Sequence, residues 1–222
     1  MTFYQRLVGE TVGGQMALAS TPQIQDGLAG RISRETYIAY LTEAYHHVKH
    51  TVPLMREARA RMDAAHQRFV QALDDYIAEE TGHEHWILAD IKNCGGDAEA
   101  ARTGTPRPAT LAMTDYAYDY IRHRNPMGFF GMVFVLEGTS VRLATQGAEA
   151  VARNLGLGPE CFSYLTSHGS LDLEHLAFFE TLMNEVEDPA DQAAIIEVAQ
   201  AIFERFAKVF LSIPHTREAA HA

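Results

Sequence analysis

The amino-acid sequence predicts an all-α fold, a single helical bundle of about seven helices. Apolar residues recur every three to four residues through most of the chain, which is the period of an amphipathic helix. The sequence has no convincing run of alternating β-branched residues bounded by turn residues, so we expect no sheet. Short segments rich in glycine, proline and polar residues separate the periodic stretches. The length of 222 residues suits one domain over residues 1–222.

The first three predicted helices occupy the N-terminal half. The first covers residues 2–18 and ends before the turn-forming segment TPQ. The second covers residues 32–59 and contains Pro53, which is expected to kink it. The third covers residues 63–93 and ends at the glycine-containing segment NCGGD.

Four further helices are predicted in the second half. The segments TGTPRP and NPMG bound a helix over residues 109–123. The next covers residues 127–155 and ends at LGLGPE. The last two cover residues 160–186 and 190–212, and the dipeptide DP lies between them. No repeat of solenoid period and no low-complexity segment appears.

The composition excludes several classes of protein. The formal net charge is −11 and no basic patch occurs, which argues against a nucleic-acid or anionic-membrane partner. No signal peptide is visible, and no uninterrupted apolar run is long enough for a membrane span. Cys94 and Cys161 form no CxxC or zinc-type pattern. We therefore expect a cytoplasmic protein with reduced cysteines.

The segment HGSLDLEH places three polar groups on an apolar helix face. At about 100° per residue, His168, Asp172 and His175 lie within roughly 60° of one another. The apolar residues on the same face are Leu171, Leu176, Phe179, Leu182, Met183 and Val186. A buried ionised carboxylate is costly unless it is paired. Either these three groups satisfy one another, or a cation binds there.

Two other predicted helices carry acids or histidines on their apolar faces. On helix 63–93, Glu80 lies at the centre of the apolar stripe and His83 lies near its edge, one turn later. On helix 127–155, Glu137 follows the apolar run FGMVFVL and projects to the buried side. Both helices therefore offer candidate partners for the HGSLDLEH segment.

The three helices together supply three histidines and three carboxylates. The candidate metal ligands are Glu80, His83, Glu137, His168, Asp172 and His175. Imidazole and carboxylate are suitable ligands for iron and manganese, and the acid-x-x-His pairs resemble those of carboxylate-bridged bundle proteins. The alternative is a set of structural core histidines and ion pairs. Six unpaired buried titratable groups would be very destabilising, which favours the metal. Such binding should weaken when the histidines are protonated at low pH.

A second set of polar residues lies in the helix predicted at 32–59. Glu43, His47 and His50 have similar spacing, but they lie on the side opposite the apolar stripe. A solvated face is the favoured interpretation. If the helix is instead buried on both sides, Glu43 or His47 would hydrogen-bond to a metal ligand or act as a seventh ligand. His47 would then also be a candidate axial ligand of haem.

Three segments resemble the haem-oxygenase-like helical superfamily, which includes the TenA and PqqC proteins and diiron oxidases. They are YLTEAYHHVKHTVPLM, EETGHEHWILADIKNCGGD, and GMVFVLEGTS followed by TSHGSLDLEH, and the resemblance covers about residues 30–212. The His168, Asp172, His175 pattern looks like the last ligand helix of the diiron members. Some members place a carboxylate two turns before the counterpart of His83, where this chain has Tyr76. Glu80 is the substitute, which implies that one iron is held more weakly.

The resemblance implies a TenA/PqqC-like bundle around a central pocket, often dimeric, with Fe(II) and O₂. The favoured hypothesis is a non-haem diiron oxidase or oxygenase that oxidises a small organic substrate, working as a homodimer. The residues do not distinguish two irons from a manganese–iron pair, and they name no catalytic residue beyond the ligands.

Three alternatives remain open from the sequence. One is a metal-free enzyme like PqqC or TenA, although neither Cys94 nor Cys161 lies on a stripe beside the candidate site, where the TenA branch uses a catalytic cysteine. Another is a haem-binding or haem-degrading protein with His47 as the axial ligand. The last is a non-enzymatic helical regulatory protein whose buried polar cluster is structural.

Overall fold

Helices form along almost the whole described chain, as the periodicity of its apolar residues predicts. A computed structural model describes the backbone of residues 1–216, with the side chains of these residues except 168–175. The α-helices are α1 (Phe3–Ala19), α2 (Pro22–Leu28), α3 (Arg34–Val48), α4 (Thr51–Arg61), α5 (Gln67–Glu80), α6 (Glu84–Asn93), α7 (Ala98–Thr103), α8 (Pro108–His123), α9 (Phe129–Leu155), α10 (Ser163–Asn184) and α11 (Pro189–Ser212). Three 3-10 turns, η1 (Ala64–His66), η2 (Pro126–Gly128) and η3 (Pro159–Cys161), connect some of them. The prediction of an all-α fold is confirmed.

The number of helices differs from the prediction because two long predicted helices are each divided. The helix predicted at 32–59 is broken between Val48 and Thr51, so α3 and α4 are separate. Pro53 falls in the first turn of α4, where a missing N–H has no helical partner to lose. The structure thus has a helix end where we expected a kink. Two short helices, α2 and α7, add to the count in segments predicted as loops.

The second division falls between α5 and α6. Helix α5 ends at Glu80, and Gly82 has a φ of +99°, a conformation that L side chains rarely adopt. Helix α6 begins after His83. The chain therefore changes direction within three residues, and the two candidate ligands of this region lie on opposite sides of the turn.

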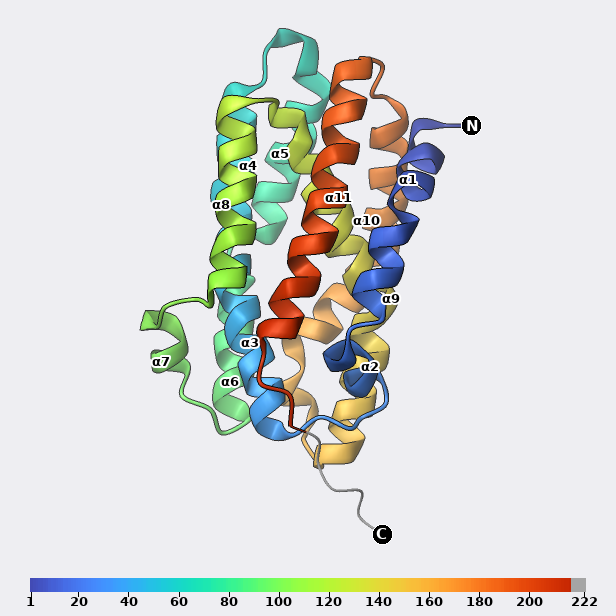
Figure 1. Ribbon diagram of the computed structural model, residues 1–222. Coiled ribbons are helices and arrows are strands. Elements are labelled where there is room, and N and C mark those ends of the chain that lie inside the picture. Colours follow the sequence, from blue (N-terminus) through green and yellow to red (C-terminus); the bar gives the residue numbers. More distant parts are fainter. Residues whose placement is uncertain (217–222) are drawn as a thin grey trace.

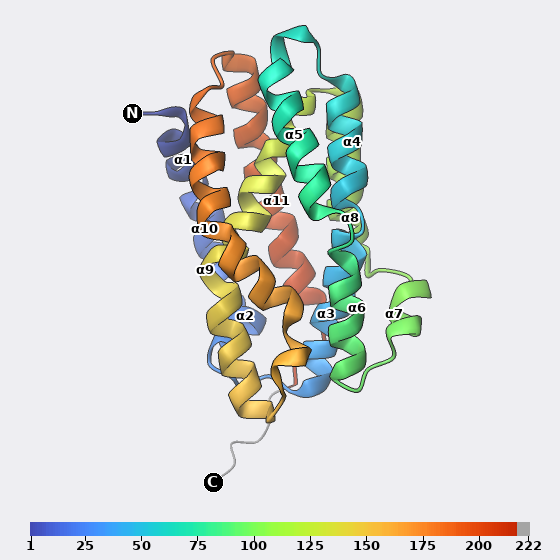
Figure 2. The same cartoon turned by 180° about the vertical axis from the view of Figure 1, so that it is seen from behind.

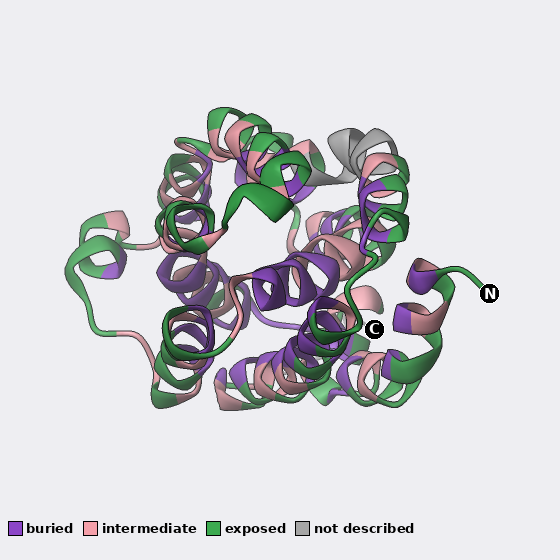
Figure 3. Ribbon diagram, turned by 90° about the horizontal axis from the view of Figure 1, so that it is seen from above, coloured by how far each residue is buried: buried purple, intermediate pink, exposed green. Residues whose placement is uncertain are grey.

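The long helices run roughly parallel to one axis of the molecule (Figure 1). Helix α9 packs against both α10 and α11, and α1 covers α11. Helices α4, α5 and α8 form one end of the bundle, whereas α2, α3 and α6 lie toward the other, as the reverse view also shows (Figure 2). The short α7 stands away from the bundle beside α6. Seen along the axis, the helices turn their buried faces inward (Figure 3).

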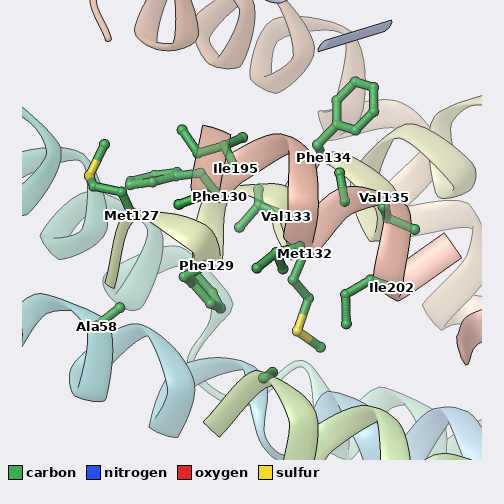
Figure 4. Close-up of a cluster of buried hydrophobic side chains, with 14 of the residues drawn as sticks. Ala58, Met127, Phe129, Phe130, Met132, Val133, Phe134, Val135, Ile195 and Ile202 are labelled. Atoms are coloured by element: carbon green, nitrogen blue, oxygen red, sulfur yellow. The ribbon is translucent and has the colours of Figure 1, made fainter. Parts of the chain in front are cut away.

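The centre of the core is the first half of α9. Residues 129–135 are all buried, and Phe130 and Val135 are fully so (Figure 4). Gly131 permits a close crossing of α9 and α11, because a Cβ there would lie 2.3 Å from the Ile195 carbonyl oxygen. Among the described residues, one stretch, 126–155, has the length and hydropathy of a membrane span, and 56% of its apolar window is buried. A core helix has the same properties.

Candidate metal centre

Glu80 and His83 form a close pair at the turn between α5 and α6. Glu80 is the last residue of α5, and His83 immediately precedes the first residue of α6. The His83 Nδ1 atom lies 3.0 Å from Glu80 Oε2, and the two side chains are only 9% and 10% exposed. The His83 ring also stacks on Trp86, with ring centroids 4.0 Å apart. The structure brings this predicted pair together across a helix break, although the sequence suggested a continuous helix.

Glu137 lines the same cavity as Glu80. It follows the apolar first half of α9 and is partly buried. A cavity of about 70 Å³ is lined by Glu80, Glu137 and His47, with Phe129, Met132 and Val133 among its apolar walls. Two predicted carboxylates from different helices therefore face one small enclosed space.

The pKa of the Tyr76 hydroxyl reflects the negative charge of this region. Its side chain is 2% exposed on α5. Burial raises the pKa of its hydroxyl most, and the negative charges of Glu137, Glu79 and Glu80 raise it further. Tyr76 is also the position at which some members of the resembled superfamily have a carboxylate. The phenol thus lies beside the carboxylates that the sequence analysis selected.

His47 lies inside the protein, where a solvated face was predicted. It is 4% exposed, and α3 packs against α6, α7 and α8. Its ring meets Phe206 of α11 edge-on at a centroid distance of 5.6 Å. The Nδ1 atom is buried and has no hydrogen-bond partner in the part of the chain that the structure describes. Burial, followed by the charges of His50 and His46, lowers the pKa of His47 to about 4, so the imidazole is neutral near pH 7.

Glu43 is equally buried, but its carboxylate already accepts two hydrogen bonds. Oε2 accepts hydrogen bonds from the backbone N–H of Arg107 at 3.1 Å and from the Thr110 hydroxyl at 2.5 Å. These donors lie at the N-terminus of α8, so Glu43 acts as a cap for that helix from a neighbouring helix. The prediction of a solvated face is wrong for Glu43 as well. Its hydrogen bonds make it a poor candidate for an additional ligand.

His168, Asp172 and His175 lie on α10, outside the residues whose side chains the structure describes. Within the described part of the chain, no three His, Cys, Asp or Glu side chains form a metal-binding group. The described portion of the candidate centre is therefore Glu80, His83 and Glu137, with His47 beside them.

Asp90 fixes the start of the helix that carries those three residues, and it was not among the residues predicted from the sequence. It lies on α6 and is fully buried. Its carboxylate accepts hydrogen bonds from the backbone N–H groups of Ser163 and Tyr164 at 3.0 and 2.9 Å, and from the Ser163 hydroxyl. A signal was present, since Asp90 lies between the buried positions Ile87 and Ile91 on a helical face.

A second cavity, of about 140 Å³, adjoins the first. His47, Leu136, Ser140 and Tyr164 line both spaces. Among the described residues, the lining of the second cavity includes His47 but no Asp, Glu, Lys or Arg. A mostly apolar space with a few polar groups is typical of a binding site for a small molecule. The second cavity therefore lies next to the cavity that Glu80 and Glu137 line.

The sequence pattern of a family described as "Iron-containing redox enzyme" matches residues 38–206. The chain belongs to this family. The match includes all six predicted ligands and both Glu43 and His47. Membership of this family therefore associates the chain with iron and with redox chemistry.

Solved structures with the same fold cover nearly the whole chain. A domain of unknown function with a haem-oxygenase-like fold from Shewanella denitrificans is 21% identical, with a TM-score of 0.86 over 96% of this chain and 92% of that one. A TenA homologue from Pseudomonas syringae pv. tomato is 12% identical, with a TM-score of 0.79 over 94% and 90%. Haem oxygenase-1 from the cyanobacterium Synechocystis, in complex with haem, is 13% identical, with a TM-score of 0.75 over 95% and 91%.

The structural comparisons confirm the haem-oxygenase-like, TenA-like fold. No curated protein sequence matches the chain. At these identities the solved structures show the fold alone, and they include both a haem protein and TenA homologues. Glu80, Glu137 and His47 line one cavity, and His83 contacts Glu80. Carboxylates and imidazoles are residue types that bind iron, so these side chains could supply part of an iron site.

Proposed function

We propose that this iron-containing redox enzyme is a non-haem diiron oxidase or oxygenase acting on a small organic substrate. The observation that carries the proposal is the cavity lined jointly by Glu80, Glu137 and His47, with His83 3.0 Å from Glu80. The remaining ligands would be His168, Asp172 and His175 of α10, the helix whose start Asp90 fixes. Iron bound there would supply the redox chemistry, with O₂ as the oxidant.

The protein's own residues prepare this centre in distinct ways. The stack on Trp86 and the contact with Glu80 hold the His83 ring in one orientation. Phe129, Met132 and Val133 supply apolar walls to the cavity. Apolar surroundings strengthen the electrostatic interaction between the carboxylates and a bound cation. His47 remains neutral and keeps a nitrogen lone pair available to a metal ion or to a substrate proton.

The turn between α5 and α6 supports unequal affinity of the two metal positions. Glu80 and His83 are three residues apart in the chain and contact each other, so they favour one metal position. Tyr76 occupies the place where some members of the superfamily have a carboxylate. A phenol whose pKa is raised by burial is a weaker ligand than a carboxylate. We therefore expect one ion to be bound tightly and the other loosely.

Haem is the second candidate, because His47 is a buried imidazole beside a cavity and its Nδ1 atom has no hydrogen-bond partner among the described residues. The size of that cavity argues against it. Its volume is about 140 Å³, whereas sites for drug-sized ligands are roughly 300–1,000 Å³. A porphyrin would require α3 and α9 to separate. The non-haem proposal needs no such movement.

The test is anaerobic loading with Fe(II), followed by metal analysis and measurement of O₂ uptake. We expect about two irons per chain, as in carboxylate-bridged bundle proteins, and O₂ uptake that depends on iron. Glu80→Gln should lose one iron and most of the O₂ uptake. Glu79→Gln, which alters the exposed neighbouring carboxylate, should behave like the wild type. Absence of bound iron, or equal behaviour of the two variants, would contradict the proposal. A strong visible band on titration with haem would favour the second candidate.

A further inference from the structure

The lining of the second cavity extends along α3 and α9 and includes residues of α2, α10 and α11. Its lining includes Thr36 and His47 on α3, which are eleven residues apart in the sequence. At about 1.5 Å per residue, this separation corresponds to roughly 16 Å along the helix axis. The volume of about 140 Å³ is therefore distributed along a narrow path. This shape suits an extended chain rather than a flat ring system.

The two ends of the cavity differ in chemistry. The His47 end is shared with the candidate metal centre. At the other end, Gln23 of α2 and Ile213 meet, and the Thr36 hydroxyl contacts the neighbouring Pro214 carbonyl at 3.0 Å. Gln23 is thus placed at the end remote from Glu80 and Glu137.

Gln23 has one satisfied and one unsatisfied polar atom. Its Nε2 donates a hydrogen bond to the Ile213 carbonyl oxygen at 3.3 Å, which assigns the amide nitrogen and oxygen. Its Oε1 is buried and has no hydrogen-bond partner among the described residues. A buried acceptor without a donor costs free energy that a ligand with a donor group can recover. Gln23 therefore favours a ligand that presents an O–H or N–H group at this end.

The lining between the two ends restricts the body of the ligand. Its described residues include no Asp, Glu, Lys or Arg, and most of them are aliphatic or aromatic. A charged group placed among these apolar side chains would lose its hydration at a high cost in free energy. The cavity thus accepts an uncharged, mainly aliphatic segment.

We propose that Gln23 is a specificity-determining residue for an elongated substrate whose remote end carries a neutral hydrogen-bond donor, such as a hydroxyl group. The substrate has a narrow aliphatic body along α3 and α9, and its reacting end lies between His47 and the carboxylates Glu80 and Glu137. The placement of the reacting end rests on the proposed function. The selection at Gln23 rests on the remote end of the cavity alone.

The probes are alkyl hydroxamates of equal chain length that end in a methyl, a hydroxyl or a carboxylate group. The hydroxamate head chelates iron, and binding is measured by calorimetry with iron-loaded and iron-free protein over a series of chain lengths. We expect the hydroxyl-ended probe to bind about threefold to tenfold more tightly than the methyl-ended one, as one net hydrogen bond allows. The carboxylate-ended probe should bind most weakly.

The variant is Gln23→Met, which keeps the shape of the side chain and removes the acceptor. It should lose the preference for the hydroxyl group, whereas Gln25→Met, an exposed position on the same helix, should keep it. Thermal unfolding checks that both variants fold. Equal affinity of the wild type for the hydroxyl- and methyl-ended probes would overturn the proposal, with no variant needed. A preference that survives in Gln23→Met would overturn it too.

The iron dependence separates this inference from the proposed function. If the hydroxyl preference persists without iron and only Gln23→Met abolishes it, the role of Gln23 stands even where the metal centre fails. If the probes bind through iron but show no preference at the remote end, the metal centre stands and the role of Gln23 fails.

Discussion

Glu43 and His47 lie one turn apart on α3, and each is 4% exposed, yet they differ in every polar contact. The Glu43 carboxylate accepts hydrogen bonds from Arg107 and Thr110 and caps α8. The His47 Nδ1 atom has no hydrogen-bond partner within the described residues, and the His47 side chain lines two cavities. Burial is thus the same, whereas hydrogen bonding separates a structural polar group from one that is available for chemistry.

The largest effect on stability is expected from Glu43→Ala. Removal of the carboxylate leaves the Arg107 N–H and the buried Thr110 hydroxyl without their acceptor and removes the cap of α8. We expect a loss of about 3 kcal/mol in the free energy of unfolding, from a lost charged cap and unsatisfied donors. Chemical denaturation of the metal-free protein measures it. Iron content should stay unchanged, and a loss of iron without a loss of stability would place Glu43 in the metal centre instead.

The next effect is a pH dependence that His47 produces. In the unfolded chain His47 takes up a proton as the pH falls below about 6.5, whereas its pKa in the folded protein is about 4. Between these values the unfolded state binds more protons, so acid destabilises the folded state. We expect the metal-free protein to lose about 2–3 kcal/mol through this group between pH 7 and pH 4.

The control for this pH effect is His47→Leu, measured by denaturation at several pH values. The other histidines and carboxylates titrate in both proteins, so the difference between the two curves isolates His47. The wild type should become less stable than the variant as the pH falls below about 6.5. Parallel curves would show that the buried imidazole is protonated without cost, contrary to its burial.

Asp90 is a second satisfied carboxylate, and it gives a smaller effect. Asp90→Asn keeps one acceptor oxygen but loses the charge and one of the contacts to Ser163 and Tyr164. We expect a loss of about 1–2 kcal/mol. Hydrogen exchange of the first turn of α10 should become faster, with little change at α8. Unchanged exchange there would mean that Asp90 does not fix α10.

The sequence predicts the helices better than their ends. Helix α8, predicted at 109–123 and observed at Pro108–His123, has an apolar stripe and clear turn residues on both sides. The division of α5 from α6 follows from how the two helices pack, although Gly82 was a visible signal. The same turn explains why Glu80 and His83 meet. Their predicted proximity came from helical spacing, and the structure produces it through a change of chain direction.

The error at α3 has a different physical cause. A single helix projection identifies one apolar stripe, and it treats the opposite face as solvated. The polar side of α3 is covered by other elements, and the donors that satisfy Glu43 lie 64 and 67 residues further along the chain. No local pattern contains that information. For His47, burial was only the alternative prediction from the sequence. Its contact with Phe206 of α11 shows that the side chain is buried.

The smallest effect on stability is expected from His47→Phe, and it tests the comparison most directly. Phenylalanine fills a similar volume, retains an edge-on contact with Phe206 and removes a buried nitrogen that has no hydrogen-bond partner. Replacing an unsatisfied buried polar group with an apolar one of similar shape is nearly neutral or stabilising, so the free energy of unfolding near pH 7 should change by less than about 1 kcal/mol. O₂ uptake by the iron-loaded protein should fall nonetheless, because the lone pair at the junction of the two cavities is gone. A large loss of stability would mean that His47 is a structural residue like Glu43, and that burial and hydrogen bonding do not separate the two roles on this helix.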